Sequence, residues 1–382
     1  MTKNWIGLIL CTAIAVCGCT KEKEEIPTKN TPVFTRFSLP VTPFDYAASG
    51  ITLMNRSGLL ANQDNTPSNN DITPWAASLG RVLFYDKTLS KNRTLACASC
   101  HQQEFGFSDT ARLSVGFDGE KTGRHSMGLS NARFHLTGRF FWDERASTLE
   151  EQVLQPIQDP IEMGLTLDTL VHRISTDPDY TTLFELAFPN EQIDTITIAK
   201  ALAQFVRSLT SLDSKFEQQL VLAGNPKAPF PGFSPAENNG KRIFFDHPTF
   251  QCASCHFTRG FVTDVPRNNG INDLDPGAYI VNNDPNMRGA FKTPSLINVA
   301  IRPPYMHNGT LSTLEQVVEH YNSGLENQGG SLDPHLVDVN DRSHGLRLNL
   351  SDTEKQNLIA FLHTLSDQDL LSNPAYASPF PN

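Results

Sequence analysis

The pentapeptide Cys-Ala-Ser-Cys-His occurs twice in this chain, at 97–101 and again at 252–256. Two cysteines two residues apart, followed directly by a histidine, can attach one porphyrin covalently and supply a ligand to its iron. A dithiol redox site would need a βαβ setting, and a zinc site would need further cysteine or histidine ligands at short spacing. Neither setting is present, so each repeat predicts one covalently bound haem c. The residues expected to bind it are Cys97, Cys100, His101, Cys252, Cys255 and His256, with both histidines as iron ligands.

Three further cysteines lie near the start of the chain. Lys3 followed by the apolar segment 6–16 is typical of an export signal, and Val16-Cys17-Gly18-Cys19 resembles the lipobox of bacterial lipoproteins. We therefore expect a signal peptide over 1–18 and a lipid anchor on Cys19, in the periplasm or at the cell surface of a bacterium. An ordinary secretory signal is the alternative. In both cases the protein is exported. Apart from Cys19, the exported part keeps four cysteines, all of them in the two repeats.

The two repeats lie in similar surroundings. Gly-Arg-Val-Leu-Phe-Tyr-Asp at 80–86 precedes the first repeat, and Gly-Lys-Arg-Ile-Phe-Phe-Asp at 240–246 precedes the second. The segment 223–240 between them is rich in Pro, Gly and Asn, which is typical of a linker. The sequence therefore predicts two related domains. The expected divisions are a tether and N-terminal segment over 19–60, a first domain over 61–225 and a second over 226–382.

Helical patterns dominate both halves of the chain. Apolar residues recur at helical spacing from Ile198 to Leu209 and from Leu358 to Leu365, whereas alternating strand patterns are scarce. Three serines stand three residues before a glutamate and are candidates for capping boxes at helix starts: Ser147, Ser312 and Ser351. We expect a mostly α fold with long, irregular loops wrapped around bulky cofactors.

Charge narrows the choice of partners. The formal net charge is −10 at pH 7, which argues against nucleic acid, because binding to phosphates depends on clustered Lys and Arg. A basic protein partner fits an acidic chain better.

The chain resembles the bacterial di-haem cytochrome c peroxidase family, including its MauG branch, from about Trp75 to Ser366. The resemblance rests on the first repeat with the Phe-Gly-Phe-Ser-Asp that follows it, and on three longer segments at 140–164, 289–300 and 303–324. It implies two cytochrome c-like domains. The N-terminal haem would be peroxidatic and the C-terminal haem would transfer electrons.

The resemblance also implies roles for three residues. Trp142 matches the tryptophan that lies between the two haems, and Gln152 and Glu162 match the pair above the peroxidatic iron. A carboxylate suits that position, because breaking an O–O bond needs one group that accepts a proton from the near oxygen and delivers it to the far one.

Two positions separate the branches of the family. Peroxidase members place a histidine over the resting peroxidatic iron, where this chain has Phe117, so we expect an open first haem, with His125 as an alternative ligand. The distal ligand of the second haem is Met in the peroxidases and Tyr in MauG, and the matching residue is Tyr321. Met287, Met306 and His320 are the alternatives at that haem.

A calcium ion and a homodimer are left open. The carbonyl groups that hold calcium in relatives would fall on Arg302 and Pro304, but the matching asparagine is His125, and imidazole is a poor ligand for a hard cation. Water or Asn131 would have to substitute for it.

The leading functional hypothesis is reduction of hydrogen peroxide at the His101 haem with electrons from a small donor protein such as a cytochrome c. One alternative is a MauG-like oxidase acting on a protein or a small substrate. The other is an electron-transfer lipoprotein without catalytic activity.

Overall fold

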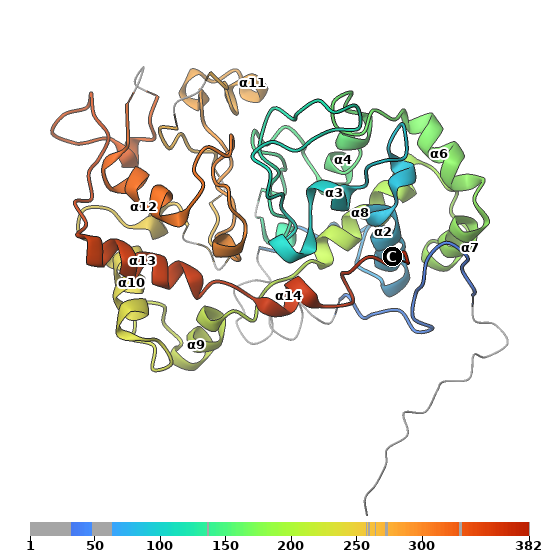
Figure 1. Cartoon of the computed structure of the whole chain (residues 1–382), viewed down its shortest axis with the longest axis horizontal. Coiled ribbons are helices and arrows are strands. Elements are labelled where there is room, and N and C mark those ends of the chain that lie inside the picture. Colours follow the sequence, from blue (N-terminus) through green and yellow to red (C-terminus); the bar gives the residue numbers. More distant parts are fainter. Residues whose placement is uncertain are drawn as a thin grey trace, which may run out of the picture. The chain divides into compact units, whose positions relative to one another are not determined.

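The computed structural model describes residues 32–47, 63–135, 137–256, 258, 260–263, 265–271, 274–327 and 331–381. The predicted signal peptide and Cys19 lie outside the described residues. Within these ranges the chain is mostly helical and forms isolated β-bridges but no sheet, which confirms the predicted fold class (Figure 1). None of the helices found there combines the length and apolar character of a membrane span.

The elements follow one another along the described chain with loops between them. The α-helices are α2 (Pro74–Tyr85), α3 (Cys97–Cys100), α4 (Leu149–Gln152), α5 (Gln155–Gln158), α6 (Leu167–Ser175), α7 (Pro178–Ala187), α8 (Thr195–Ser208), α9 (Lys215–Ala223), α10 (Pro235–Asp246), α11 (Tyr279–Asn282), α12 (Leu314–Ser323), α13 (Asp352–His363) and α14 (Gln368–Ser372). The short 3₁₀ turns are η2 (Lys87–Leu89), η3 (Gln103–Phe105), η4 (Ala132–Phe134), η5 (Cys252–Ser254), η6 (Pro285–Met287), η7 (Val299–Ile301) and η9 (Pro334–Leu336).

The first hydrophobic core forms where α2 packs on α8 and α7. Helix α8 starts at a capping box in which Asp194 and Thr197 satisfy each other's backbone N–H groups. Its predicted apolar stripe from Ile198 to Leu209 is buried against α2, because residues at helical spacing share one face.

The second core repeats this arrangement with α10 on α13, side by side in Figure 1. Both helices begin at a serine in a capping box, Ser234 with Glu237 and Ser351 with Glu354, so the box expected at Ser351 is present. Rings from α9, α10 and α13 pack together in this core: Phe216, Phe244 and Phe361.

The glycine that opens each repeated heptapeptide lies at a helix crossing. A Cβ added to Gly80 would stand 2.0 Å from the carbonyl oxygen of Ala201 on α8, and one added to Gly240 would stand 1.8 Å from that of Asn357 on α13. Only glycine allows the two backbones of each pair to approach this closely. The same packing solution therefore holds both cores together.

The domain boundary at 226 stays a prediction. Phe216, on α9, packs in the second core. The segment after α13 returns to the first core, where Tyr376 donates a hydrogen bond to the carbonyl oxygen of Ser208 at 3.0 Å. The N-terminal segment is also more than a tether, because Thr35 donates to Asp179 and Phe37 is buried.

Two of the three expected capping boxes are wrong by one residue. Helices α4 and α12 are capped by Thr148 and Thr313, not by Ser147 and Ser312. In both places a Ser-Thr pair precedes the helix and two registers fit the pattern, and in each case the chain adopts the later one.

We expect Gly80→Ala and Gly240→Ala each to lower the free energy of unfolding by about 2 kcal/mol or more, because the new methyl group would meet backbone rather than a side chain that can move aside. Chemical denaturation monitored by circular dichroism measures this. Gly260→Ala is the matched control, since a Cβ there makes only ordinary contacts, at 3.9 Å or longer. Equal stability of all three variants would contradict the helix-crossing argument.

Candidate functional site

Each repeated motif fixes its histidine in the same way. The Nδ1 atom of His101 lies 3.0 Å from the carbonyl oxygen of Phe107, and Nδ1 of His256 lies 2.8 Å from that of Phe261. Both phenylalanines follow a glycine and have positive φ angles, 59° and 55°, which turn their carbonyl groups toward the ring. An imidazole that donates from Nδ1 keeps Nε2 free to bind a metal.

The surroundings of both motifs fit a haem. The cysteines of each pair form no disulfide in the structure, so both thiols remain for thioether bonds. A cavity of about 600 Å³ adjoins the first motif, and one of about 200 Å³ adjoins the second. Apolar side chains line both, and Phe84 and Phe244 occupy matching positions in them. A porphyrin held by two thioethers and one imidazole would fill such a space.

Gln152 and Glu162 line the first cavity, and their position above the iron stays a prediction. Burial and the nearby carboxylate of Asp159 raise the pKa of Glu162 to about 7, against the opposing influence of Arg145. A carboxyl group with this pKa exists in both protonation states near neutrality, which suits an acid/base group. A third, polar pocket, distinct from both cavities, is lined by Arg145, Gln155, Asp159 and Glu162.

Phe117 does not line the first cavity. Its backbone N–H donates to the carbonyl oxygen of Glu162 at 3.0 Å, while its ring packs over Gly164, where an added Cβ would meet it at 2.4 Å. The alternative ligand His125 lines both cavities, and its Nδ1 lies 3.2 Å from the carbonyl oxygens of Ala111 and Arg112. The open face of the first haem remains a prediction.

Trp142 lines both cavities and is buried. Its Nε1 donates to the carbonyl oxygen of His125 at 2.8 Å, and its ring lies edge-on to His307, with 6.4 Å between the centroids. His307 in turn stacks on Phe291 at 3.5 Å. A row of aromatic rings therefore begins at the boundary between the cavities and continues along the second one.

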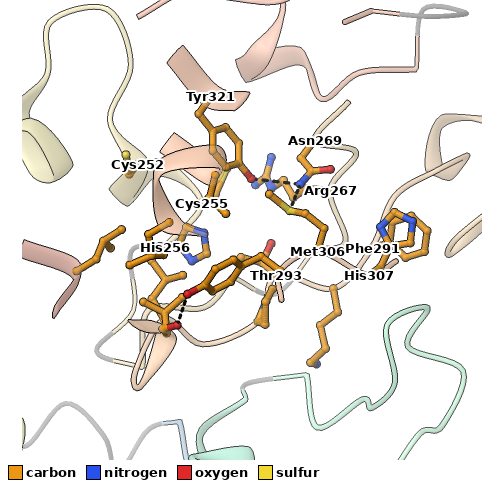
Figure 2. A pocket seen from close by; sticks show the side chains of 18 of the residues that line it. Cys252, Cys255, His256, Arg267, Asn269, Phe291, Thr293, Met306, His307 and Tyr321 are labelled. Atoms are coloured by element: carbon orange, nitrogen blue, oxygen red, sulfur yellow. Dashed lines mark hydrogen bonds between the residues drawn. The ribbon is translucent and has the colours of Figure 1, made fainter. Parts of the chain in front are cut away.

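Two possible iron ligands in the second cavity accept hydrogen bonds from the same side-chain amide. The Nδ2 atom of Asn269 lies 3.2 Å from the hydroxyl oxygen of Tyr321 and 3.2 Å from the sulfur of Met306 (Figure 2). Both side chains line the cavity that also contains His256. Burial raises the pKa of Tyr321 to about 12, so the free phenol stays protonated.

The other two alternatives for the distal ligand of the second haem, His320 and Met287, do not line the second cavity. His320 neighbours Tyr321 on α12, but its Nε2 lies 2.8 Å from the carbonyl oxygen of Asn269, and it does not line the cavity. Met287 ends η6 and does not line the cavity either. The structure thus leaves Tyr321 and Met306 as the candidates, with Tyr321 the predicted ligand.

The residues considered for calcium have other contacts. The side-chain amide of Asn131 is used on both sides by the backbone of Ser211, at 2.9 and 2.8 Å, and cannot replace the missing asparagine without breaking these bonds. Arg302 and Pro304 both line the second cavity. Calcium binding stays a prediction.

Sequence reasoning missed Asn269, His307 and the side chain of Arg302. Asn269 and Tyr321 are 52 residues apart, and no local pattern signals such a contact. His307 had a signal, since it stands in the segment 303–324 on which the resemblance rests.

Comparison with known proteins gives a consistent picture. The family described as "Di-haem cytochrome c peroxidase" matches residues 74–225. The methylamine utilization protein MauG of Methylorubrum extorquens is 34% identical over 78% of this chain and 80% of its own length. Cytochrome c551 peroxidase of Pseudomonas aeruginosa is 30% identical over 75% of this chain and 78% of its own length. A crystal structure of a MauG-like protein associated with microbial copper homeostasis is 34% identical, with a TM-score of 0.70, and the match covers 83% of this chain and 96% of that one.

We expect Tyr321→Phe to change the absorption and EPR spectra of the haem bound to His256, because the variant loses the oxygen donor. Met306→Leu, which removes the sulfur at the other end of the same amide, should leave those spectra unchanged. A sulfur-to-iron absorption band in the unaltered protein that disappears in Met306→Leu would assign the ligand to Met306 instead.

Proposed function

The chain belongs to the bacterial di-haem cytochrome c peroxidase family that includes MauG, and on this premise we propose that it reduces hydrogen peroxide with electrons from a small redox protein. The observation that carries the proposal is Glu162, a carboxyl group with a pKa of about 7 on the lining of the first cavity. Members of the family hold two covalently bound haems, and each motif with its cavity fits one of them.

In this proposal the haem at His101 supplies the redox chemistry, and the protein handles the proton. Glu162 would take the proton from one oxygen of the peroxide and deliver it to the other oxygen, which would leave as water. Gln152, on the same lining, orients the bound oxidant. The polar pocket at Arg145 and Gln155 gives a small, hydrophilic oxidant a route to Glu162.

Electrons would reach this site from the second domain. The proposal assigns to Trp142 the link between the haems, supported by its position on the lining of both cavities. A basic redox protein suits a chain with a formal charge of −10 as the donor, since opposite charges steer association.

A second candidate, a MauG-like oxidase acting on a protein or small substrate, is favoured by Tyr321. An oxygen ligand lowers the potential of the second haem and suits it to sharing oxidising equivalents rather than relaying donor electrons. The similarity to MauG supports the same reading. Peroxide consumption that needs a partner protein to be oxidised, and no external donor, would select this function. The relatives named here as peroxidases are enzymes, which disfavours a purely electron-transferring role.

Export and a lipid anchor on Cys19 complete the proposal. The lipobox-like Val16-Cys17-Gly18-Cys19 supports it, and covalent haem attachment through cysteine pairs fits a chain exported from the cytoplasm. The mass of the mature N-terminal residue tests this part.

Replacing Glu162 with Gln should lower peroxide turnover by about 10²- to 10⁴-fold, the range for loss of a general acid/base. The assay follows oxidation of a reduced donor cytochrome by hydrogen peroxide. Glu185→Gln, at an exposed carboxylate on α7 of the same domain, is the control and should retain full turnover. Unchanged turnover in Glu162→Gln would remove the basis of the proposed mechanism.

The pH dependence should report the same group. Glu162 must be ionised to take the first proton, so turnover should rise with pH through an inflection near 7. Asp159→Asn removes a negative neighbour and should move the inflection to lower pH, while its amide oxygen can still accept from Ile161 and Glu162. An inflection that does not move in Asp159→Asn would mean that another group controls the profile.

A further inference from the structure

The guanidinium of Arg302 borders the second cavity and contacts no carboxylate in the part of the chain that the structure describes. Its Nη2 donates to the carbonyl oxygen of Ser295, while Nε is buried and has no acceptor. Burial lowers the pKa of Arg302 to about 10, so the group keeps its charge at neutral pH. A buried charge with an unsatisfied donor is strongly unfavourable unless an anion completes its surroundings.

Neighbouring side chains do not supply that anion. Burial raises the pKa of Tyr305 to about 12, and its neutral hydroxyl donates to the carbonyl oxygen of Val299 at 3.1 Å. Arg267 and Lys292 line the same cavity, but each forms an ion pair, Arg267 with Asp333 at 2.8 Å and Lys292 with Glu144 at 3.3 Å. Of the three Lys and Arg side chains on this lining, Arg302 is the one that forms no ion pair within the described residues.

The first domain leaves room for the Arg302 side chain. A Cβ added to Gly128 would stand 2.6 Å from Nη1 of Arg302, and one added to Gly106 would stand 3.9 Å from its Cδ. His256 and His125 line the same cavity as Arg302. The guanidinium therefore borders the cavity that contains the histidine expected to ligate the second iron.

We propose that Arg302 is the counter-ion for a propionate of the haem bound to His256. The only carboxylates of a haem are its two propionates. Thioether bonds form at the vinyl groups and leave both propionates free. A guanidinium pairs with a carboxylate through two parallel hydrogen bonds, and Nε with one Nη atom forms one of the pairs of donors that it can use. The proposal rests on the haem content of the family and does not depend on the proposed peroxide chemistry.

Spectroelectrochemical titration of the two haems in the full-length holoprotein tests the proposal. Arg302→Gln should lower the reduction potential of the His256 haem, because loss of the positive charge disfavours the more negative ferrous state. We expect at least a ten-fold change in the reduction equilibrium, which is about 59 mV for one electron. Arg302→Lys keeps the positive charge, so the reduction potential of its His256 haem should stay close to that of the unaltered protein. Arg242→Gln, which removes the same charge from an exposed position on α10, should leave both potentials within two-fold of the unaltered protein.

The propionate bending band in the resonance Raman spectrum gives a second readout, which should shift in Arg302→Gln and not in Arg242→Gln. Should Arg302→Gln fail to fold, Gly128→Ala carries the test, because its methyl group displaces the guanidinium without changing the charge of the chain. It should lower the potential of the His256 haem and shift the same band. Unchanged potentials and an unchanged band in the folded variant would overturn the proposal, as would a shift confined to the His101 haem.

Discussion

The hydrogen bond from each motif histidine to a phenylalanine carbonyl group sets the geometry on which the site depends. It fixes the plane of the imidazole, and with it the direction in which Nε2 faces the cavity. Glu162 lines the same cavity as His101, which its proposed acid/base role requires. The helix crossings at Gly80 and Gly240 keep the two motifs in equivalent frameworks.

The two halves share this framework but differ in the groups that face the motif histidine. The first cavity is the larger and adjoins a polar pocket at Glu162, whereas the second places Tyr321 and Met306 at one amide. A bound oxidant needs space and a group that carries protons, whereas an iron that only transfers electrons needs a full set of ligands and little rearrangement. The proposed difference in function between the two halves would therefore rest on a few side chains around two similar motifs.

Local signals in the sequence predicted the motifs, the helical class and the stripe from Ile198 to Leu209, because each depends on neighbours along the chain. The resemblance implied roles for Gln152, Glu162, Trp142 and Tyr321. The structure places these residues on the cavity linings, and their roles stay predictions. What escaped prediction depends on distant contacts, such as the amide of Asn269 at Tyr321. The predicted starts of α4 and α12 were wrong by one residue, because adjacent Ser and Thr residues can both cap the helix.

The return of the C-terminal segment to the first core has a consequence for biosynthesis. Arg81 and Tyr85 on α2 donate to the carbonyl oxygens of Ala377 and Tyr376, at 2.6 and 2.7 Å. These bonds can form only after residues 376 and 377 have been synthesised. The first core, which includes Tyr376, is therefore completed by residues that follow both motifs along the chain.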